Sequence, residues 1–113
     1  MDRHLLAGTL DLLILEAVAS AAGSKSYGYE ITQTVLEGTD RQVTLSEGSL
    51  YPALHRMERE GWLKAEWQQA GGRRRKYYKL TAAGSKTLAA KRAGWSSFVA
   101  ALGGLVKPAE RTA

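Results

Sequence analysis

The sequence predicts a mainly α-helical fold that carries one small β-hairpin and ends in a long helix. Three observations predict this fold class. Apolar residues recur at helical spacing in four segments, two short runs after Gly61 alternate between apolar and polar residues, and a glycine pair stands between those runs. A chain of 113 residues without an internal repeat is expected to form one unit with a modest core.

The first helix is expected around Leu10 to Ala21, where apolar residues recur at helical spacing. Leu12 and Leu15 make its opposite side apolar as well. A helix that is apolar all round is buried on more than one side. In so short a chain, this pattern suggests that a second subunit covers part of the helix.

The second helix is expected in the segment YGYEITQTVLEG, after the breaker-rich loop AAGSKS. Ser26 is a candidate cap, and Gly38 is the expected end. Tyr27, Ile31 and Val35 share one face of this helix.

The third helix is expected in SEGSLYPALHRMEREGWL, where Leu50, Leu54 and Met57 at i, i+4 and i+7 form a narrow apolar face. Ser46 can cap its start, as can Thr44 with Glu47 in capping-box spacing, and Gly61 suits the left-handed residue that ends it. The opposite face is small and neutral at first and cationic further on; it contains Gly48, Pro52, His55, Arg56 and Arg59, flanked by Ser49 and Tyr51. An ordinary surface helix with solvated arginines would show the same pattern.

A β-hairpin is expected next, because Leu63, Ala65 and Trp67 alternate with polar residues, as do Tyr78 and Leu80 beyond the turn QAGGRR. Its tip and return strand carry four consecutive cations: Arg73, Arg74, Arg75 and Lys76. One interpretation is a solvated tip that protects the strand edge from aggregation. We favour a contact to nucleic acid, because the cluster follows a flexible glycine pair and lies one hairpin away from the basic helix.

A long C-terminal helix is expected from Thr81 to about Val106. Its apolar residues recur at steps of seven, four, three and four, namely Leu88, Trp95, Val99, Leu102 and Val106. Such a stripe resembles a coiled-coil seam, so these residues are expected to form the interface of a two-fold symmetric homodimer. The tail from Lys107 to Ala113 is expected to be flexible.

The charge distribution favours a polyanionic partner. Lys and Arg number 16 against 11 Asp and Glu, which gives a net charge of +5 and a pI near 9.7. Between Arg56 and Arg92, eleven residues are basic and three are acidic. The basic surface is therefore expected on the third helix, the hairpin and the start of the last helix.

Several classes of function are disfavoured by composition. The chain has no cysteine, which excludes a disulfide, a thiolate metal site and a cysteine nucleophile. His4 and His55 are its only histidines, and neither a catalytic triad nor a glycine-rich phosphate loop is evident, so we expect no enzyme, metal or cofactor. The apolar runs are too short for a membrane span and no signal peptide is recognisable, so we expect a soluble, cytoplasmic protein.

In order, three helices, a basic hairpin and a long helix make a winged helix-turn-helix with an attached dimerisation helix. The expected division is residues 1–80 for the DNA-binding domain and residues 81–113 for the dimerisation helix and tail. The third helix would be the recognition helix, with side chains that reach base edges or phosphates in the major groove, and the hairpin would be the wing.

In these motifs the sequence resembles the short-form PadR family of bacterial transcriptional regulators. The resemblance extends from about Gly8 to Leu102 and rests on GTLDLLIL, YGYEI, EGSLYPALHRMEREGWL, GGRRRKYYKLTAAG and Trp95. It implies a homodimer that usually represses nearby genes and that, in many members, is released by small molecules such as phenolic acids or lipophilic drugs.

The resemblance also implies roles for single residues. The recognition helix would carry Ser49, Tyr51, Pro52, His55 and Arg56. The wing would carry Gly72, Arg73, Arg74 and Lys76, and Tyr27 would lie where a helix braces against the DNA backbone. Trp95 corresponds to a dimer-helix tryptophan that lines a hydrophobic effector site in drug-sensing members, and a plain role in the dimer core stays open. Arg74 stands where many members have proline, which strengthens the expected phosphate contact.

Two rival interpretations remain. A protein-interaction adaptor could use the same fold without reading DNA, but it would not need consecutive cations on the wing or show a steep salt dependence. RNA binding is disfavoured, because the exposed strand faces show no aromatic stacking platform beyond Tyr77.

Overall fold

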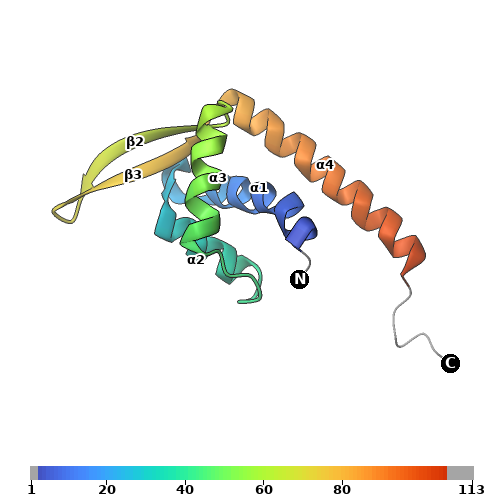
Figure 1. Cartoon of the computed structure of the whole chain (residues 1–113). Helices are drawn as coiled ribbons and strands as arrows, with labels where there is room; N and C mark the ends of the chain where they lie inside the picture. The colour runs from blue at the N-terminus through green and yellow to red at the C-terminus, as the bar shows by residue number, and fades with distance from the viewer. Residues whose placement is uncertain (1–2, 107–113) are drawn as a thin grey trace.

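A computed structural model of the chain describes residues 3–106, and the side chains of residues 9–106. Its elements, in order, are α1 (Arg3–Ser20), the short 3-10 helix η1 (Ala22–Ser24), β1 (Ser26–Tyr27), α2 (Gly28–Gly38), α3 (Glu47–Arg59), β2 (Leu63–Ala70), β3 (Arg73–Leu80) and α4 (Ala82–Leu105). The predicted fold class is confirmed: helices α1 to α3 cluster, the β2–β3 hairpin projects from one side, and α4 extends from the other (Figure 1). The expected flexible tail, residues 107–113, lies outside the described residues.

The core lies between the first three helices and the inner part of the sheet. Its buried residues come from α1, α2, the loop before α3 (Leu45), α3, β2, β3 and the start of α4. The largest fully buried side chains include Tyr78, Ile14, Leu15, Ile31, Leu50, Leu54 and Met57. The predicted buried stripe of α3 is therefore confirmed. This packing holds the opposite face of α3 toward solvent.

Both ends of α3 are specified by local chemistry. The backbone N–H of Ser49 donates to Ser46 Oγ at 3.2 Å, so Ser46 is the cap. At the other end Gly61 has φ +81°, and the N–H of Trp62 donates to the carbonyl of Met57 at 2.9 Å, as in a Schellman motif. Pro52 lies in the second turn, where it has no N–H to donate to the carbonyl of Gly48, so the helix there lacks one backbone hydrogen bond.

The sheet has a third strand that the sequence pattern does not predict. β1 pairs antiparallel with β3, through Ser26 with Tyr78 and Tyr27 with Tyr77, and the strand order is β1-β3-β2. Ser26 was the expected cap of the second helix, but it lies in β1, and Tyr27 is the residue at the cap position. Glu30 reaches back to accept from the Tyr27 N–H and the Ser26 hydroxyl, both at 3.3 Å.

The hairpin closes with a two-residue loop. β2 and β3 pair in continuous register from Leu63 with Leu80 to Ala70 with Arg73. Gly71 and Gly72 have φ of +58° and +77°, and positive φ at both central residues characterises the turn that matches the natural twist of two strands. The glycine pair therefore positions the arginines directly beyond the turn.

Helix α4 begins inside the fold and ends outside it. Thr81 caps it, since its Oγ1 accepts from the Gly84 N–H at 2.9 Å. Leu88 was expected in the dimer seam. It is only 3% exposed and belongs to the chain's own core, so it is not available to a second copy. Beyond Lys91 the helix is exposed and projects from the cluster, which gives the chain extents of 61 × 27 × 24 Å. Among the described residues, no helix combines the length and apolar character needed to cross a membrane.

Candidate nucleic-acid interface

The exposed face of α3 carries the side chains that the sequence places on a recognition helix. Ser49, Tyr51, Pro52 and His55 are all exposed, on the side away from the buried stripe. The hydroxyl of Tyr51 packs against Gly28 at the start of α2, where a Cβ atom would lie 2.3 Å from the phenolic oxygen. Gly28 therefore sets how closely α3 approaches α2 at this face.

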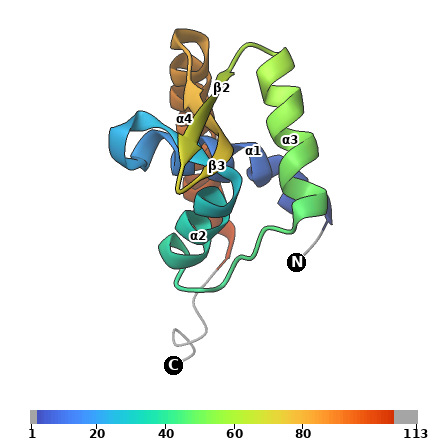
Figure 2. The same cartoon turned by 90° about the vertical axis from the view of Figure 1, so that its left-hand side faces the viewer.

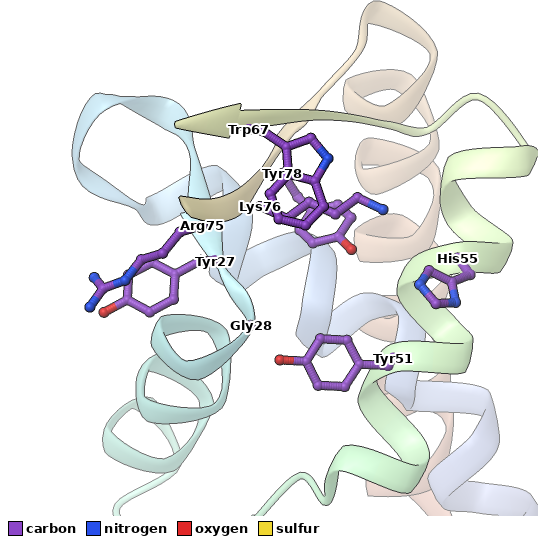
Figure 3. A pocket seen from close by; sticks show the side chains of 8 residues that line it. All are labelled: Tyr27, Gly28, Tyr51, His55, Trp67, Arg75, Lys76 and Tyr78. Carbon is purple, nitrogen blue, oxygen red and sulfur yellow. The ribbon is translucent and has the colours of Figure 1, made fainter. Parts of the chain in front are cut away.

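A cleft of about 400 Å³ lies between α3 and the sheet (Figure 3). Tyr51 and His55 face it from α3, and Trp67 lies across from them on β2, above Lys76 and Tyr78. Its full lining is Tyr27, Gly28, Tyr51, His55, Trp67, Arg75, Lys76 and Tyr78. Hydroxyls, aromatic faces and cations thus line one surface between the α3 face and the wing.

The wing arginines are arranged by stacking. The Arg74 guanidinium lies 4.8 Å from the ring centre of Trp67, and that of Arg75 lies 4.5 Å from the ring centre of Tyr27. Stacking orients a guanidinium while its N–H edge stays available to an anion. In the described part of the chain, no carboxylate forms an ion pair with Arg73, Arg74 or Arg75. These three positive charges are available to a ligand.

Arg75 belongs to the run of four cations that is expected to contact nucleic acid. Trp67 is the residue that was not expected at this site. Trp67 was expected on the half-buried side of its strand, yet it is 56% exposed. The reason is that the hairpin extends past the core, so alternation along β2 no longer separates buried from exposed positions near the tip. The available signal was a tryptophan in the strand that pairs with the basic run, opposite Lys76 and near the arginines.

Lys76, an expected DNA contact, forms an ion pair with a carboxylate of the same chain. Its Nζ lies 3.4 Å from Glu58 Oε1 of α3, and the side chain is 28% exposed. Burial lowers its pKa, but Tyr78 and Glu58 outweigh that effect, so the net pKa is raised and the amine stays charged. Lys76 therefore ties the wing to α3 and is a poorer phosphate ligand than the three arginines.

Arg56, also an expected DNA contact, forms a two-pronged ion pair with Asp11 of α1. The two terminal nitrogens of its guanidinium donate to the two carboxylate oxygens at 3.0 and 2.6 Å. The hydrogen bond to Asp11 raises the pKa of Arg56. The positive charge is thus compensated inside the protein.

Comparison with known proteins identifies the family. The sequence model of the transcriptional regulator PadR-like family matches residues 14–90. The chain belongs to the PadR family. A transcriptional regulator of Mycobacterium tuberculosis is 36% identical to this PadR-family chain over 74 residues, which make up 66% of each protein.

Solved structures of regulators share its fold. A transcriptional regulator from Clostridium thermocellum has a TM-score of 0.82 at 30% identity, with 92% of this chain and 99% of that chain covered. A PadR family transcription regulator from Clostridium difficile has a TM-score of 0.74 at 33% identity, with 88% and 99% covered. PadR-like regulators bind DNA, and the matched proteins are transcriptional regulators, a class that is not ordinarily enzymatic.

The outer part of α4 exposes the other candidate site of this PadR-family chain. Trp95, Val99, Leu102 and Val106, all expected in the dimer seam, are between 42% and 57% exposed. The same stripe includes Phe98, whose ring centre is 6.1 Å from that of Trp95, and the exposed Leu105. This apolar surface is contiguous along the part of the helix that lies outside the core.

Proposed function

We propose that this PadR-family chain is a homodimeric, sequence-specific DNA-binding repressor of nearby genes. The observation that carries the proposal is the cleft between the exposed face of α3 and the wing, together with the three wing arginines that no described carboxylate neutralises. A duplex offers a phosphate strand beside a groove of base edges. One surface that combines donors to bases with cations for phosphates suits that geometry.

In this proposal α3 enters the major groove. Ser49, Tyr51, Pro52 and His55 contribute to sequence choice, because they occupy its exposed face. Arg73, Arg74 and also Arg75 contact DNA phosphates from the wing. Tyr27 braces the start of α2 against the DNA backbone. Arg56 and Lys76, which are paired with carboxylates, are not direct contacts here.

The dimer is proposed to form through the exposed stripe of α4. Apolar side chains at coiled-coil spacing on a protruding helix are buried most simply by the same helix of a second copy. Residues 1–80 then form the DNA-binding domain and the segment from residue 81 onward the dimerisation part. Two α3 helices related by two-fold symmetry predict an inverted-repeat operator with half-sites roughly 34 Å apart.

A small hydrophobic or aromatic effector is proposed to act at Trp95. A ligand inserted between two α4 helices would change the angle between the subunits and thereby move the two α3 helices out of register with the DNA. Tryptophan fluorescence and release of labelled DNA, measured with flat aromatic compounds, test this part separately.

The experiment that tests the proposed function is a fluorescence-anisotropy titration against the DNA upstream of the chain's own gene. A scrambled duplex is the control, and both are measured at several salt concentrations. Saturable, preferential binding that falls steeply with salt is expected. Equal, weak binding to both duplexes would contradict the proposal and favour a winged-helix adaptor, for which a protein partner would then be sought.

A further inference from the structure

The recognition helix is connected on two sides by ion pairs within the chain. Arg56 points to α1 and forms an ion pair with Asp11. Glu58 points to β3 and forms an ion pair with Lys76. Residues two apart on a helix point in nearly opposite directions. α3 is therefore linked to α1 on one side and to the wing on the other, between its buried stripe and its exposed face.

We propose that Arg56 is a positioning residue that acts on DNA recognition only through Asp11, and not as a phosphate or base contact. This inference rests on the proposed function, because it concerns how α3 is presented to DNA. The sequence alone points the other way, since Arg56 lies on the cationic side of a recognition helix.

The geometry supports a positioning role. A bidentate contact between a guanidinium and a carboxylate constrains orientation as well as distance, because both groups are planar. Asp11 is 14% exposed and Arg56 is 41% exposed, so the carboxylate lies inward and the guanidinium covers it. Apolar packing of Leu50, Leu54 and Met57 seats α3 on the core, and the two-pronged ion pair adds a directional contact to α1 beside that packing.

The charge balance supports the same role. A basic residue that contacts a phosphate displaces a counterion and adds about one unit to the salt dependence of binding. Arg56 already has its counter-charge in Asp11, so its removal together with that partner leaves the net charge of the site unchanged. A phosphate contact and a positioning residue therefore differ in the salt slope.

The test compares three variants in the anisotropy assay: Asp11→Asn, Arg56→Gln and the double variant. Asp11→Asn is decisive, because the two roles predict opposite signs. If Arg56 acts by positioning, Asp11→Asn lowers the ratio of operator affinity to scrambled-duplex affinity by at least about fivefold and leaves the salt slope unchanged. A change of about fivefold is the discrimination that one base contact provides. If Arg56 contacted DNA, removal of Asp11 would free its charge, and binding would become tighter and more salt-dependent.

Arg56→Gln is expected to lower the same ratio and to leave the salt slope unchanged. The double variant is expected to be no worse than Arg56→Gln, because two members of one pair are not additive. Arg59→Gln is the matched control: it removes an equal charge from the last turn of the same helix without breaking any ion pair described in the structure. Circular dichroism and a thermal melt of each variant verify that the helices remain folded.

The outcomes separate this inference from the proposed function. If the unchanged chain does not prefer the operator, the proposed function fails and the inference fails with it. If the unchanged chain prefers the operator but Arg56→Gln reduces the salt slope by about one, or Asp11→Asn binds more tightly, the inference alone is overturned. Additive losses in the double variant overturn it as well.

Discussion

The wing and the outer part of α4 both extend beyond the core, and they expose different chemistry (Figure 2 shows the wing in front of α1 and α4, with α3 at its side). The wing presents Arg73, Arg74 and Arg75, and two of these are stacked on aromatic rings of the same chain. The outer α4 presents Trp95 and Phe98 among other apolar side chains, and no described element covers them. The wing is thus organised by contacts within the chain, whereas the α4 stripe is left uncovered by the described part of the chain.

This difference indicates how the two regions should respond to substitution. In the proposed DNA contact, charged groups on the wing act on a solvated polyanion, so single changes are expected to have graded, salt-dependent effects. In the proposed dimer, apolar groups on α4 act together, so one buried charge is expected to disrupt the whole interface.

The largest effect is expected from a charge placed in the α4 stripe. Val99→Glu should prevent dimer formation, and operator affinity should fall by about 100-fold or more, because two linked reading heads bind far better than one. Sedimentation velocity gives the oligomeric state, and anisotropy gives the affinity. Ser97→Glu, on the opposite side of the helix, is the control that should change neither. A Val99→Glu protein that remains dimeric would place the interface elsewhere.

The next largest effect is on stability, and it is expected to differ between the inner and the outer part of α4. A Cβ atom at Gly84 would lie 2.0 Å from the carbonyl oxygen of Trp62, whereas Gly94 has open space around it. Gly84→Ala should therefore lower the free energy of unfolding by about 3 kcal/mol, through backbone displacement. Gly94→Ala should raise it by up to about 1 kcal/mol, because alanine favours a helix. Urea unfolding measures both, and equal effects would contradict the close contact at Gly84.

A smaller effect is expected from the wing. Arg74→Gln should weaken binding to operator and scrambled DNA alike and reduce the salt slope by about one. His55→Ala is the contrasting variant: it should change which DNA sequence is preferred. Lys86→Gln, an exposed change on α4, controls for net charge. A loss confined to the operator in Arg74→Gln would mean that this residue reads bases.

The smallest effect concerns the contact between α1 and α4. Arg92 donates to both carboxylate oxygens of Glu16 at 2.6 Å, and this hydrogen bonding lowers the pKa of Glu16. A carboxylate with a lowered pKa in the folded state stabilises at neutral pH, and the contribution is lost as the pH falls through that pKa. Because the pair is exposed, Arg92→Gln should lower the melting temperature only slightly at pH 7. The difference should vanish near pH 2, and a difference that persists there would indicate lost packing instead of lost charge.

Local sequence patterns were sufficient to predict much of the fold and the exposed face of α3. The spacing of Leu50, Leu54 and Met57 identified the buried side, and Gly61 identified the end of the helix, because both depend on neighbours within one or two turns. The basic run identified the wing for the same reason. The fold class followed from the order of these local elements.

Residues whose roles depend on distant partners were not predictable in this way. β1 has only two residues, so no alternation can reveal it, and it exists because β3 offers an unpaired edge. Leu88 lies in the apolar pattern of α4, yet only the approach of α4 to the core buries it. The cation–π contact of Arg75 with Tyr27 likewise joins positions far apart in the sequence.

By itself, the sequence determined the order of the four main helices and the hairpin, the cap and end of α3, the hairpin turn, the basic character of the wing and the family. Periodicity, capping and composition are properties of neighbouring residues, and they survive without knowledge of the fold. The tertiary structure decided which cations are compensated, as Arg56 is by Asp11 and Lys76 by Glu58, and which apolar residues stay uncovered on α4. The physical reason is that ion pairing and burial depend on distances between segments, and folding alone brings those segments together.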